Sequence, residues 1–159
     1  MKVAVICTGN ICRSPIGEIL LRKAIADIPD MAQRVEVTSA GTANWHIGKP
    51  MDARAAAALQ RAGLPTDASL GAFASAELLR EFGLVLVMTR EHRTDVLARH
   101  PDADVLLVRE LLGHGSMDVP DPYYGRDEDF DDCLAMLREV TPLVVRELQF
   151  RLTDPAVCG

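Results

Sequence analysis

Short apolar runs alternate with longer, more polar stretches along this 159-residue chain. Four runs rich in valine, isoleucine and leucine predict β-strands, at residues 3–6, 35–40, 84–88 and 103–108. The first and third are apolar throughout, which is typical of parallel strands covered on both faces. The stretches between and after these runs predict helices, at residues 15–25, 53–61, 76–82, 90–99 and 130–150.

The alternation of strands and helices predicts an α/β fold with a doubly wound parallel sheet and helices on both faces. Ligands of such sheets bind beyond the carboxyl ends of the strands. At this length we expect a single domain over residues 1–159. Pro142 lies inside the last predicted helix and is expected to kink or interrupt it.

The segment that joins the first predicted strand to the first predicted helix reads Cys-Thr-Gly-Asn-Ile-Cys-Arg-Ser, at residues 7–14. Ser14 is a favourable N-cap and Pro15 a favourable first helical residue. Backbone N–H groups at a helix N-terminus are unpaired, and the helix dipole there favours negative charge. Gly9 and Asn10 tolerate a left-handed backbone, which lets successive N–H groups point inward. The segment is therefore predicted to be a phosphate-binding loop.

Three side chains of this loop have the chemistry of phosphoryl transfer. Cys7 is expected at the base of the loop, where a helix N-terminus and Arg13 favour the nucleophilic thiolate. Arg13 offers a planar fork for two phosphate oxygens, and the Ser14 hydroxyl is expected to donate to the Cys7 sulfur. The alternative is a structural cysteine with Arg13 in a surface ion pair. The preceding strand, the Ser-Pro helix start and the Gly-Asn pair favour the catalytic interpretation.

A proton donor is needed to displace an alkoxide or phenoxide, and Asp121 is the candidate. Two prolines flank it in Val-Pro-Asp-Pro-Tyr-Tyr-Gly, at residues 119–125, and they stiffen the loop. An ordinary Asp-Pro turn is the alternative. Cys7 follows the first strand and Asp121 follows the fourth, so both are expected at the same edge of the sheet. Tyr123 and Tyr124 are candidates to wall a cleft for an aromatic ring.

The chain resembles the low-molecular-weight protein tyrosine phosphatases over nearly its whole length, on motifs at residues 5–15, 39–42, 52–54 and 121–125. The resemblance implies a four-stranded parallel sheet in the order 2-1-3-4, and a reaction without cofactor or metal. It implies Cys7 as nucleophile, Arg13 as phosphate clamp and Asp121 as general acid and base. It also implies substrate-binding or supporting roles for the rest of the loop and for three aromatic residues: Thr8, Gly9, Asn10, Ile11, Cys12, Ser14, Trp45, Tyr123 and Tyr124.

The sequence departs from the family pattern in two places. Many members carry a histidine in a Gly/Ser-His-x-Ala-Arg stretch that supports the loop asparagine, and residues 67–73 contain none. What supports Asn10 is therefore open, and Ser69 is one candidate. Thr89 stands where an aspartate often follows the methionine at the end of the third strand.

Composition and charge argue against some classes of binding partner and of cellular location. The net charge of −6 argues against general nucleic-acid binding. Because no run of about 18 apolar residues occurs, no membrane span is predicted. The N-terminal apolar stretch is too short for a signal peptide, so we expect a cytoplasmic protein. His92, His100 and His114 show no partner pattern and are expected on the surface.

The four cysteines are too few for a disulfide framework in a domain of this size. A zinc site that joins Cys7, Cys12 and a histidine is conceivable, but Cys-x4-Cys alone is a poor zinc signature. The spacing and the family resemblance instead favour Cys12 as a partner that traps oxidised Cys7 in a reversible disulfide. Cys133 falls among helical residues and is expected to pack there.

Hydrolysis of protein phosphotyrosine through a phosphocysteine is the leading prediction. The substrate is then a tyrosine-phosphorylated protein, and a tyrosine kinase is one candidate. A protein arginine phosphatase is the first alternative; the resemblance implies that such relatives carry threonine where this chain has Ile11. A thiol-dependent arsenate reductase ranks lower, because no cysteine lies between Cys12 and Cys133. A non-catalytic phosphoprotein-binding or redox-sensing module is the third class, and the intact set of Cys7, Arg13 and Asp121 argues against it.

Overall fold

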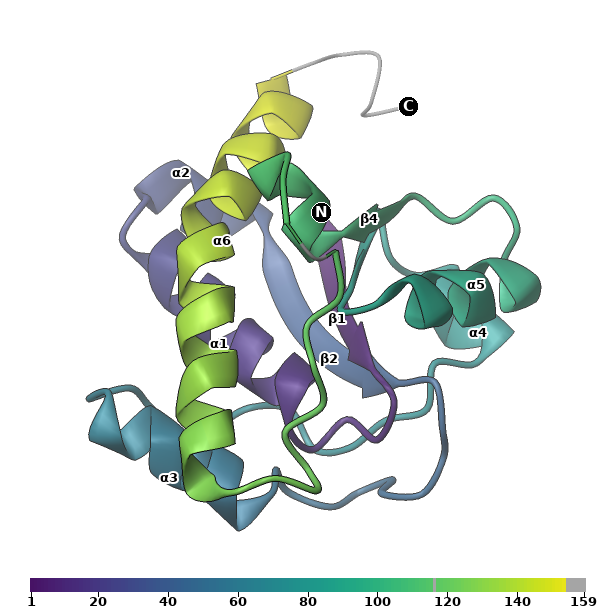
Figure 1. Cartoon of the computed structure of the whole chain (residues 1–159). Coiled ribbons are helices and arrows are strands. Elements are labelled where there is room, and N and C mark those ends of the chain that lie inside the picture. The colour runs from purple at the N-terminus through teal and green to yellow at the C-terminus, as the bar shows by residue number, and fades with distance from the viewer. Residues whose placement is uncertain (116, 154–159) are drawn as a thin grey trace.

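A four-stranded parallel sheet in the order β2-β1-β3-β4 lies at the centre of the computed structural model, which describes residues 1–115 and 117–153 (Figure 1). Its strands are β1 (Lys2–Cys7), β2 (Glu36–Gly41), β3 (Leu84–Val87) and β4 (Val105–Leu107). The predicted fold class and strand order are confirmed. In the register of β1 and β2, Cys7 pairs with Gly41, so the proposed nucleophile stands at the last position of the central strand.

Helices cover both faces of the sheet, and the alternation along β1 decides which residues meet which layer (Figure 1). Val3 and Val5 belong to the larger core, with α1 (Arg13–Ala26), α2 (Pro29–Arg34), α3 (Ala53–Arg61) and α6 (Asp127–Thr153). Ala4 and Ile6 point to the smaller core, with α4 (Ala76–Leu79) and α5 (Arg90–Arg99). Because β1 is covered on both faces, its carboxyl end is held rigidly from both sides.

All five predicted helices are present, and three of them differ from the prediction at their ends. The helices α3 and α5 have the predicted bounds, and α4 is shorter than predicted. The chain leaves β4 through a 3-10 helix, η1 (Val108–Leu112), where a longer strand was expected. The short helix α2 was not predicted, and α6 continues through Pro142 instead of being interrupted there.

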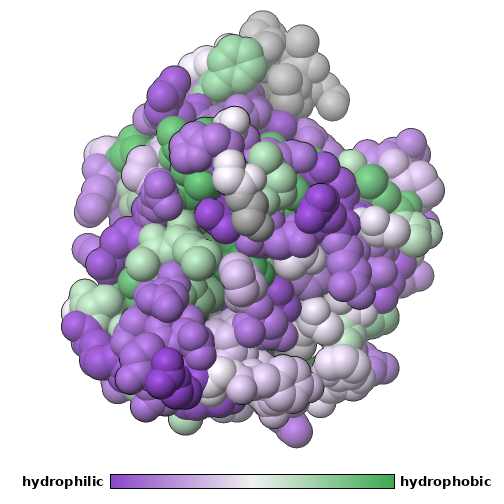
Figure 2. Space-filling view, viewed as in Figure 1, coloured by the Kyte–Doolittle hydropathy of each residue, from purple (hydrophilic) through white to green (hydrophobic). Residues whose placement is uncertain are grey.

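The segment that carries Asp121 passes from η1 back toward the N-terminus of α1 before α6 begins (Figure 1). Val119 N donates to the carbonyl of Met88, just beyond β3, at 2.9 Å, which anchors the segment at the carboxyl edge of the sheet. The face seen in Figure 2 is mostly hydrophilic, with smaller apolar patches between polar residues. None of the helices in the described ranges has the length and apolar character to cross a membrane.

Candidate active site

The loop at residues 8–12 joins the end of β1 to the start of α1, as the sequence predicts. Cys7 is 2% exposed, and its sulfur lies 3.0 Å from Ser14 Oγ. The predicted N-cap role of Ser14 is wrong: Cys12 is the N-cap, and no side chain caps the helix. The Ser14 hydroxyl instead contacts the Cys7 sulfur and accepts a hydrogen bond from Asn10. It is therefore not available to cap the helix.

Asn10 organises the loop through three hydrogen bonds. Its amide nitrogen donates to Ser14 Oγ at 2.8 Å and to Ser39 Oγ at 2.9 Å, and its amide oxygen accepts from Ala72 N at 2.9 Å. Its φ of 58° places it in the left-handed region, as predicted, whereas Gly9 does not adopt a positive φ. A Cβ at Gly9 would lie 3.3 Å from a ring carbon of His46, a tight contact that the His46 side chain would have to relieve.

A fully buried carboxylate, Glu18, supports Asn10 from beneath the loop through Ser39. Glu18, on α1, has no exposed surface and accepts from Ser39 Oγ at 2.6 Å. Its other oxygen accepts from Ser69 N at 3.0 Å, from Ser69 Oγ at 2.8 Å and from Arg22 Nη1 at 3.3 Å. Ser69 therefore supports Asn10 only indirectly, through Glu18 and Ser39. Sequence reasoning missed Glu18 and Ser39; a carboxylate on the apolar side of α1 was the available signal.

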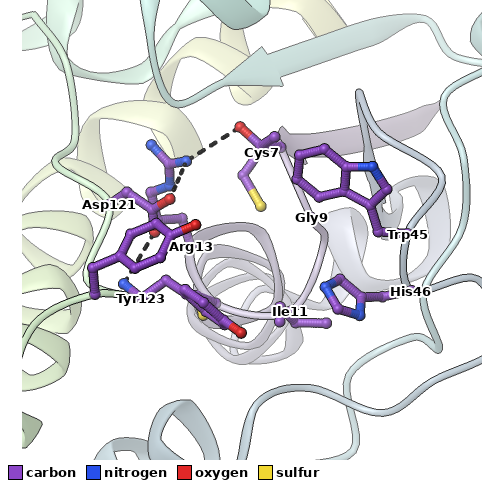
Figure 3. Close-up of a pocket in the computed structure, with 11 residues that line it drawn as sticks. Cys7, Gly9, Ile11, Arg13, Trp45, His46, Asp121 and Tyr123 are labelled. Carbon is purple, nitrogen blue, oxygen red and sulfur yellow. Dashed lines mark hydrogen bonds and ion pairs between the residues drawn. The ribbon is translucent and has the colours of Figure 1, made fainter.

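Arg13 and Asp121 meet over the loop (Figure 3). The guanidinium is buried and forms a 3.4 Å ion pair with the exposed Asp121 carboxylate. Arg13 Nη1 donates to the carbonyl of Val119 at 3.1 Å, and Nη2 donates to Thr8 Oγ1 at 3.4 Å. Arg13 Nε is buried and has no acceptor among the described protein atoms. An oxyanion held in the loop would supply that acceptor.

Arg54 fixes the position of the Asp121 loop. Its Nη1 donates to the carbonyl of Tyr123 at 2.9 Å, and its guanidinium lies 5.2 Å from the centre of the Tyr123 ring. Its polar side-chain contacts are with Asp52, the N-cap of α3, and the hydrogen bonds from Arg54 lower the pKa of that carboxyl. Tyr123 N in turn donates to Asp121 Oδ1 at 3.1 Å. The Asp-Ala-Arg motif thus holds the proposed proton donor, a role that the motif alone did not reveal.

The loop forms the floor of a pocket of about 150 Å³ whose walls come from distant segments. Asp121 and Tyr123 lie on one side of the Cys7 sulfur, and Trp45 and His46 lie on the other (Figure 3). Trp45 is 66% exposed and Tyr124 is 91% exposed, and both line the pocket. The lining also includes Thr8, Gly9, Ile11, Cys12 and Arg13. Of the predicted site residues, only Asn10 and Ser14 do not line the pocket; both lie beneath it and support the loop.

Cys12 is a buried thiol whose pKa is raised, first by burial and then by the negative charges of Asp52 and Cys7. Cys12 is therefore a protonated thiol at neutral pH. Burial likewise raises the pKa of Cys133 to about 12, in keeping with its predicted packing role in α6. Across residues 1–115 and 117–153 there is no cluster of three or more His, Cys, Asp or Glu suited to a metal ion.

His92 contradicts the prediction that it lies on the surface. It is 3% exposed, at the start of α5, and its Nε2 lies 2.8 Å from Thr8 Oγ1. The sequence around it is strongly polar, so periodicity gave no indication of burial. Its hydrogen-bond partner, Thr8, belongs to the loop at residues 8–12, which is far away in the sequence.

Comparisons with known proteins agree with this site. Residues 2–152 match the family model described as low molecular weight phosphotyrosine protein phosphatase, and the chain belongs to this family. A relative from Mycobacterium tuberculosis, low molecular weight protein-tyrosine phosphatase A, is 35% identical over 148 residues, covering 89% of this chain and 88% of the relative.

Two solved structures are similar over nearly the whole chain. The tyrosine phosphatase Wzb from Escherichia coli K30, in complex with sulphate, has a TM-score of 0.81 and 32% identity, covering 92% of this chain and 97% of that one. Wzb from Vibrio vulnificus, in complex with benzylphosphonate, has a TM-score of 0.81 and 29% identity, with coverage of 92% and 97%. The sequence-based assignment to the family is thus confirmed.

Proposed function

We propose that this protein hydrolyses phosphotyrosine in proteins, with Cys7 as the nucleophile and Asp121 as the general acid and base. The single observation that supports this most strongly is the meeting of three functional groups at one pocket. Cys7 at the end of β1, Arg13 at the start of α1 and Asp121 in the segment before α6 line it together, although Asp121 is far from the other two in the sequence. Family membership supports the same reaction class.

In the first step the phosphate oxygens bind the loop amides and the Arg13 guanidinium, which stabilise the charge of the transition state. The Cys7 thiolate attacks phosphorus in line, so an S–P bond forms as the bond from phosphorus to the phenolic oxygen breaks. Asp121 gives its proton to that leaving oxygen. Its position beside Arg13, 3.4 Å away and open to solvent, places the carboxyl at the mouth of the pocket, where the leaving group departs.

In the second step Asp121 takes a proton from a water molecule, whose oxygen attacks phosphorus and breaks the S–P bond. Inorganic phosphate is released, and the sulfur leaves as a thiolate. The Ser14 hydroxyl, 3.0 Å from the sulfur, can donate to that thiolate and make it a better leaving group. Asn10 holds Ser14 in place for this contact.

The rim of the pocket favours an aromatic substrate over phosphoarginine. Trp45 lies on one side and Tyr123 and Tyr124 on the other, so a phenyl ring can be held between aromatic faces. The apolar side chain of Ile11 adds to this lining and gives a guanidino group no hydrogen-bond acceptor.

A direct comparison of substrates tests this function. Wild-type protein and the Cys7→Ser variant are each given phosphotyrosine and phosphoarginine peptides of the same sequence, and phosphate release is measured. We expect release from phosphotyrosine by the wild type and none by the variant. Faster release from phosphoarginine, or undiminished release by Cys7→Ser, would overturn the proposal.

We place the reaction in the cytoplasm, on tyrosine-phosphorylated proteins, with an autophosphorylated tyrosine kinase as one candidate. A nucleophilic thiol works only while it is reduced, and the cytosol keeps thiols reduced. Cys12, a buried protonated thiol in the same loop, is proposed to capture Cys7 as a disulfide when peroxide converts Cys7 to a sulfenic acid, with release of water. Peroxide inactivation that stays equally reversible by thiols in Cys12→Ser would refute this regulatory role.

A further inference from the structure

His92 is a buried ionisable residue that the mechanism above does not use. It lies in the first turn of α5, where its backbone N–H donates to Thr89 Oγ1, the N-cap, at 3.2 Å. Its ring reaches across to the anion loop, with Nε2 2.8 Å from Thr8 Oγ1. The ring is thus a contact between the smaller helical layer and the phosphate-binding floor of the pocket.

The hydrogen bonds at Thr8 depend on which groups can donate. Arg13 Nη2 lies 3.4 Å from Thr8 Oγ1, and a guanidinium can only donate, so the Thr8 oxygen accepts that bond. The hydroxyl hydrogen of Thr8 is then available to His92 Nε2, or an Nε2–H group donates to the second lone pair of the Thr8 oxygen; both directions tie the Thr8 hydroxyl to the ring. With the ring proton on Nδ1, the chain of donation runs from Arg13 through Thr8 to His92.

The charge state of the ring agrees with its role as an acceptor. Burial, and next the positive charge of Arg13, lower the pKa of His92 to about 4. At neutral pH the imidazole is therefore uncharged and keeps a lone pair for the Thr8 hydroxyl. A protonated ring would face Thr8 with an N–H group and would add a second positive charge beside Arg13.

We propose that His92 is a positioning residue for phosphoryl transfer, which orients the Thr8 hydroxyl so that its oxygen holds Nη2 of Arg13. The inference rests on the proposed function. Val119 holds Nη1, and the exposed Asp121 pairs with Nη2. Thr8 is therefore the anchor of Nη2 that belongs to the loop itself. A guanidinium held at both nitrogens presents a fixed fork to the equatorial oxygens of the transferring group.

Packing alone does not account for an imidazole at this place. His92 Nδ1 is buried and has no hydrogen-bond partner among the described residues, which carries an energetic cost. A phenylalanine could fill similar space without a buried polar atom. The imidazole is therefore best explained by what its other nitrogen does for Thr8.

A double-mutant cycle with aryl phosphate hydrolysis tests the proposal. Thr8→Val removes the hydroxyl, His92→Phe removes the acceptor, and each is expected to lower kcat/KM about 3- to 10-fold, the value of one hydrogen bond. Because both changes break the same chain, the double variant should lose little more than either single variant. If the loss in kcat/KM of the double variant equals the product of the two single losses, the two side chains act independently and the proposal is overturned.

Inhibition by orthovanadate gives a readout that simple destabilisation does not move. The inhibition constant should rise in His92→Phe by a factor similar to the loss in kcat/KM, and His92→Asn, which keeps an acceptor oxygen, should recover part of it. Val96→Ala is the matched control, since Val96 is fully buried on the same helix and belongs to the smaller core. It should lower the thermal stability but leave the inhibition constant unchanged.

The outcomes separate this inference from the proposed function. If wild-type protein shows no Cys7-dependent phosphatase activity, the proposed function fails. If the wild type is active and His92→Phe binds vanadate as tightly as the wild type, only the role of His92 fails. An equal loss of vanadate affinity in Val96→Ala would assign the effect to the stability of α5 and would also overturn the proposal.

Discussion

The floor of the pocket and its rim differ in how firmly their side chains are held. On the floor, Cys7, Asn10 and Arg13 are buried, and every one of them has a specific polar contact within the protein. On the rim, Trp45 and Tyr124 are largely exposed, and among the described contacts Tyr124 meets another ring only at Tyr123, edge to face at 4.9 Å.

This difference separates chemistry from recognition. Charge stabilisation during phosphoryl transfer is effective only when the donors are already in place. The buried, hydrogen-bonded side chains of the floor meet this requirement. The rim contributes contact with the substrate's ring, which needs surface more than fixed geometry. Changes on the floor should therefore slow the reaction of every substrate, whereas changes on the rim should alter the choice among substrates.

The largest effect is expected from Asp121, which lies on the rim but is the proposed general acid and base. Asp121→Ala should lower kcat about 10²–10⁴-fold for a phosphate ester with a poor leaving group, because general acid catalysis is lost. The first step of an ester with a good leaving group should be far less affected, since its phenolate needs no proton. Steady-state and burst-phase kinetics with both esters measure this, and equal loss in the first step for both would remove Asp121 from the role of acid.

A somewhat smaller effect is expected when the support of the floor is removed at Asn10. Asn10→Ala loses three hydrogen bonds. It also places alanine, which lacks the polar side chain of asparagine, at a φ of 58°. The free energy of unfolding should fall by about 2–4 kcal/mol, from unsatisfied buried groups and left-handed strain. Urea unfolding measures this loss.

Asn10→Gly is the matched variant, because glycine removes the same hydrogen bonds without the conformational strain. It should be more stable than Asn10→Ala by about 1 kcal/mol. If the two variants are equally stable, the left-handed backbone at Asn10 costs alanine nothing, and that part of the account is wrong.

The pH dependence of stability should also report on the floor. In the folded protein the pKa of His92 is lowered to about 4 by burial and by Arg13, whereas the pKa of the side chain in the unfolded chain is 6.5. As the pH falls from 6.5 to 4 the unfolded chain binds a proton that the folded protein does not. Acidification should therefore lower the free energy of unfolding of the wild type by up to about 3 kcal/mol more than that of His92→Gln.

Urea unfolding at pH 7, 5.5 and 4.5 measures this difference in slope. His114→Gln, at an exposed position, is the control and should follow the wild type. If wild type and His92→Gln lose stability equally on acidification, His92 is not held neutral by the fold.

The smallest effect is expected at the rim. Trp45→Ala should lower kcat/KM for phosphotyrosine peptides about 3- to 10-fold, the value of one ring contact, while hardly changing the inhibition constant of inorganic phosphate. Phe150→Ala, which removes another exposed aromatic ring at the far end of α6, should change neither. A large rise in the phosphate inhibition constant for Trp45→Ala would show that rim and floor are not separate.

The sequence predicts those parts of the molecule that depend on local pattern. Buried strands, the strand-loop-helix unit around Cys7 and the capped start of α3 follow from hydrophobicity, glycine and capping residues close together in the chain. The meeting of Cys7 and Asp121 follows from topology, because parallel strands end at one edge. The short helix α2, with one fully buried residue, Met31, has too weak a pattern to be recognised.

The parts that were missed depend on contacts between distant segments. Ser14 is a different case: its contact with the Cys7 sulfur was predicted, and only its N-cap role is wrong, because Cys7 and Asn10 of the same loop use its hydroxyl. His92 stands among charged residues, yet it is buried and contacts Thr8 of the loop, which is far away in the sequence. Glu18 supports Asn10 through Ser39, a relation that no spacing along the chain reveals.

Identification of the phosphorylated intermediate tests the central claim most directly. In Asp121→Ala, an aryl phosphate with a good leaving group should still phosphorylate the enzyme, but water attack lacks its base, so the intermediate should accumulate. Acid quenching, digestion and mass spectrometry with fragmentation should then find one phosphoryl group on the sulfur of Cys7. Phosphate on any other residue, or turnover with no phosphorylated enzyme at any quench time, would contradict the account.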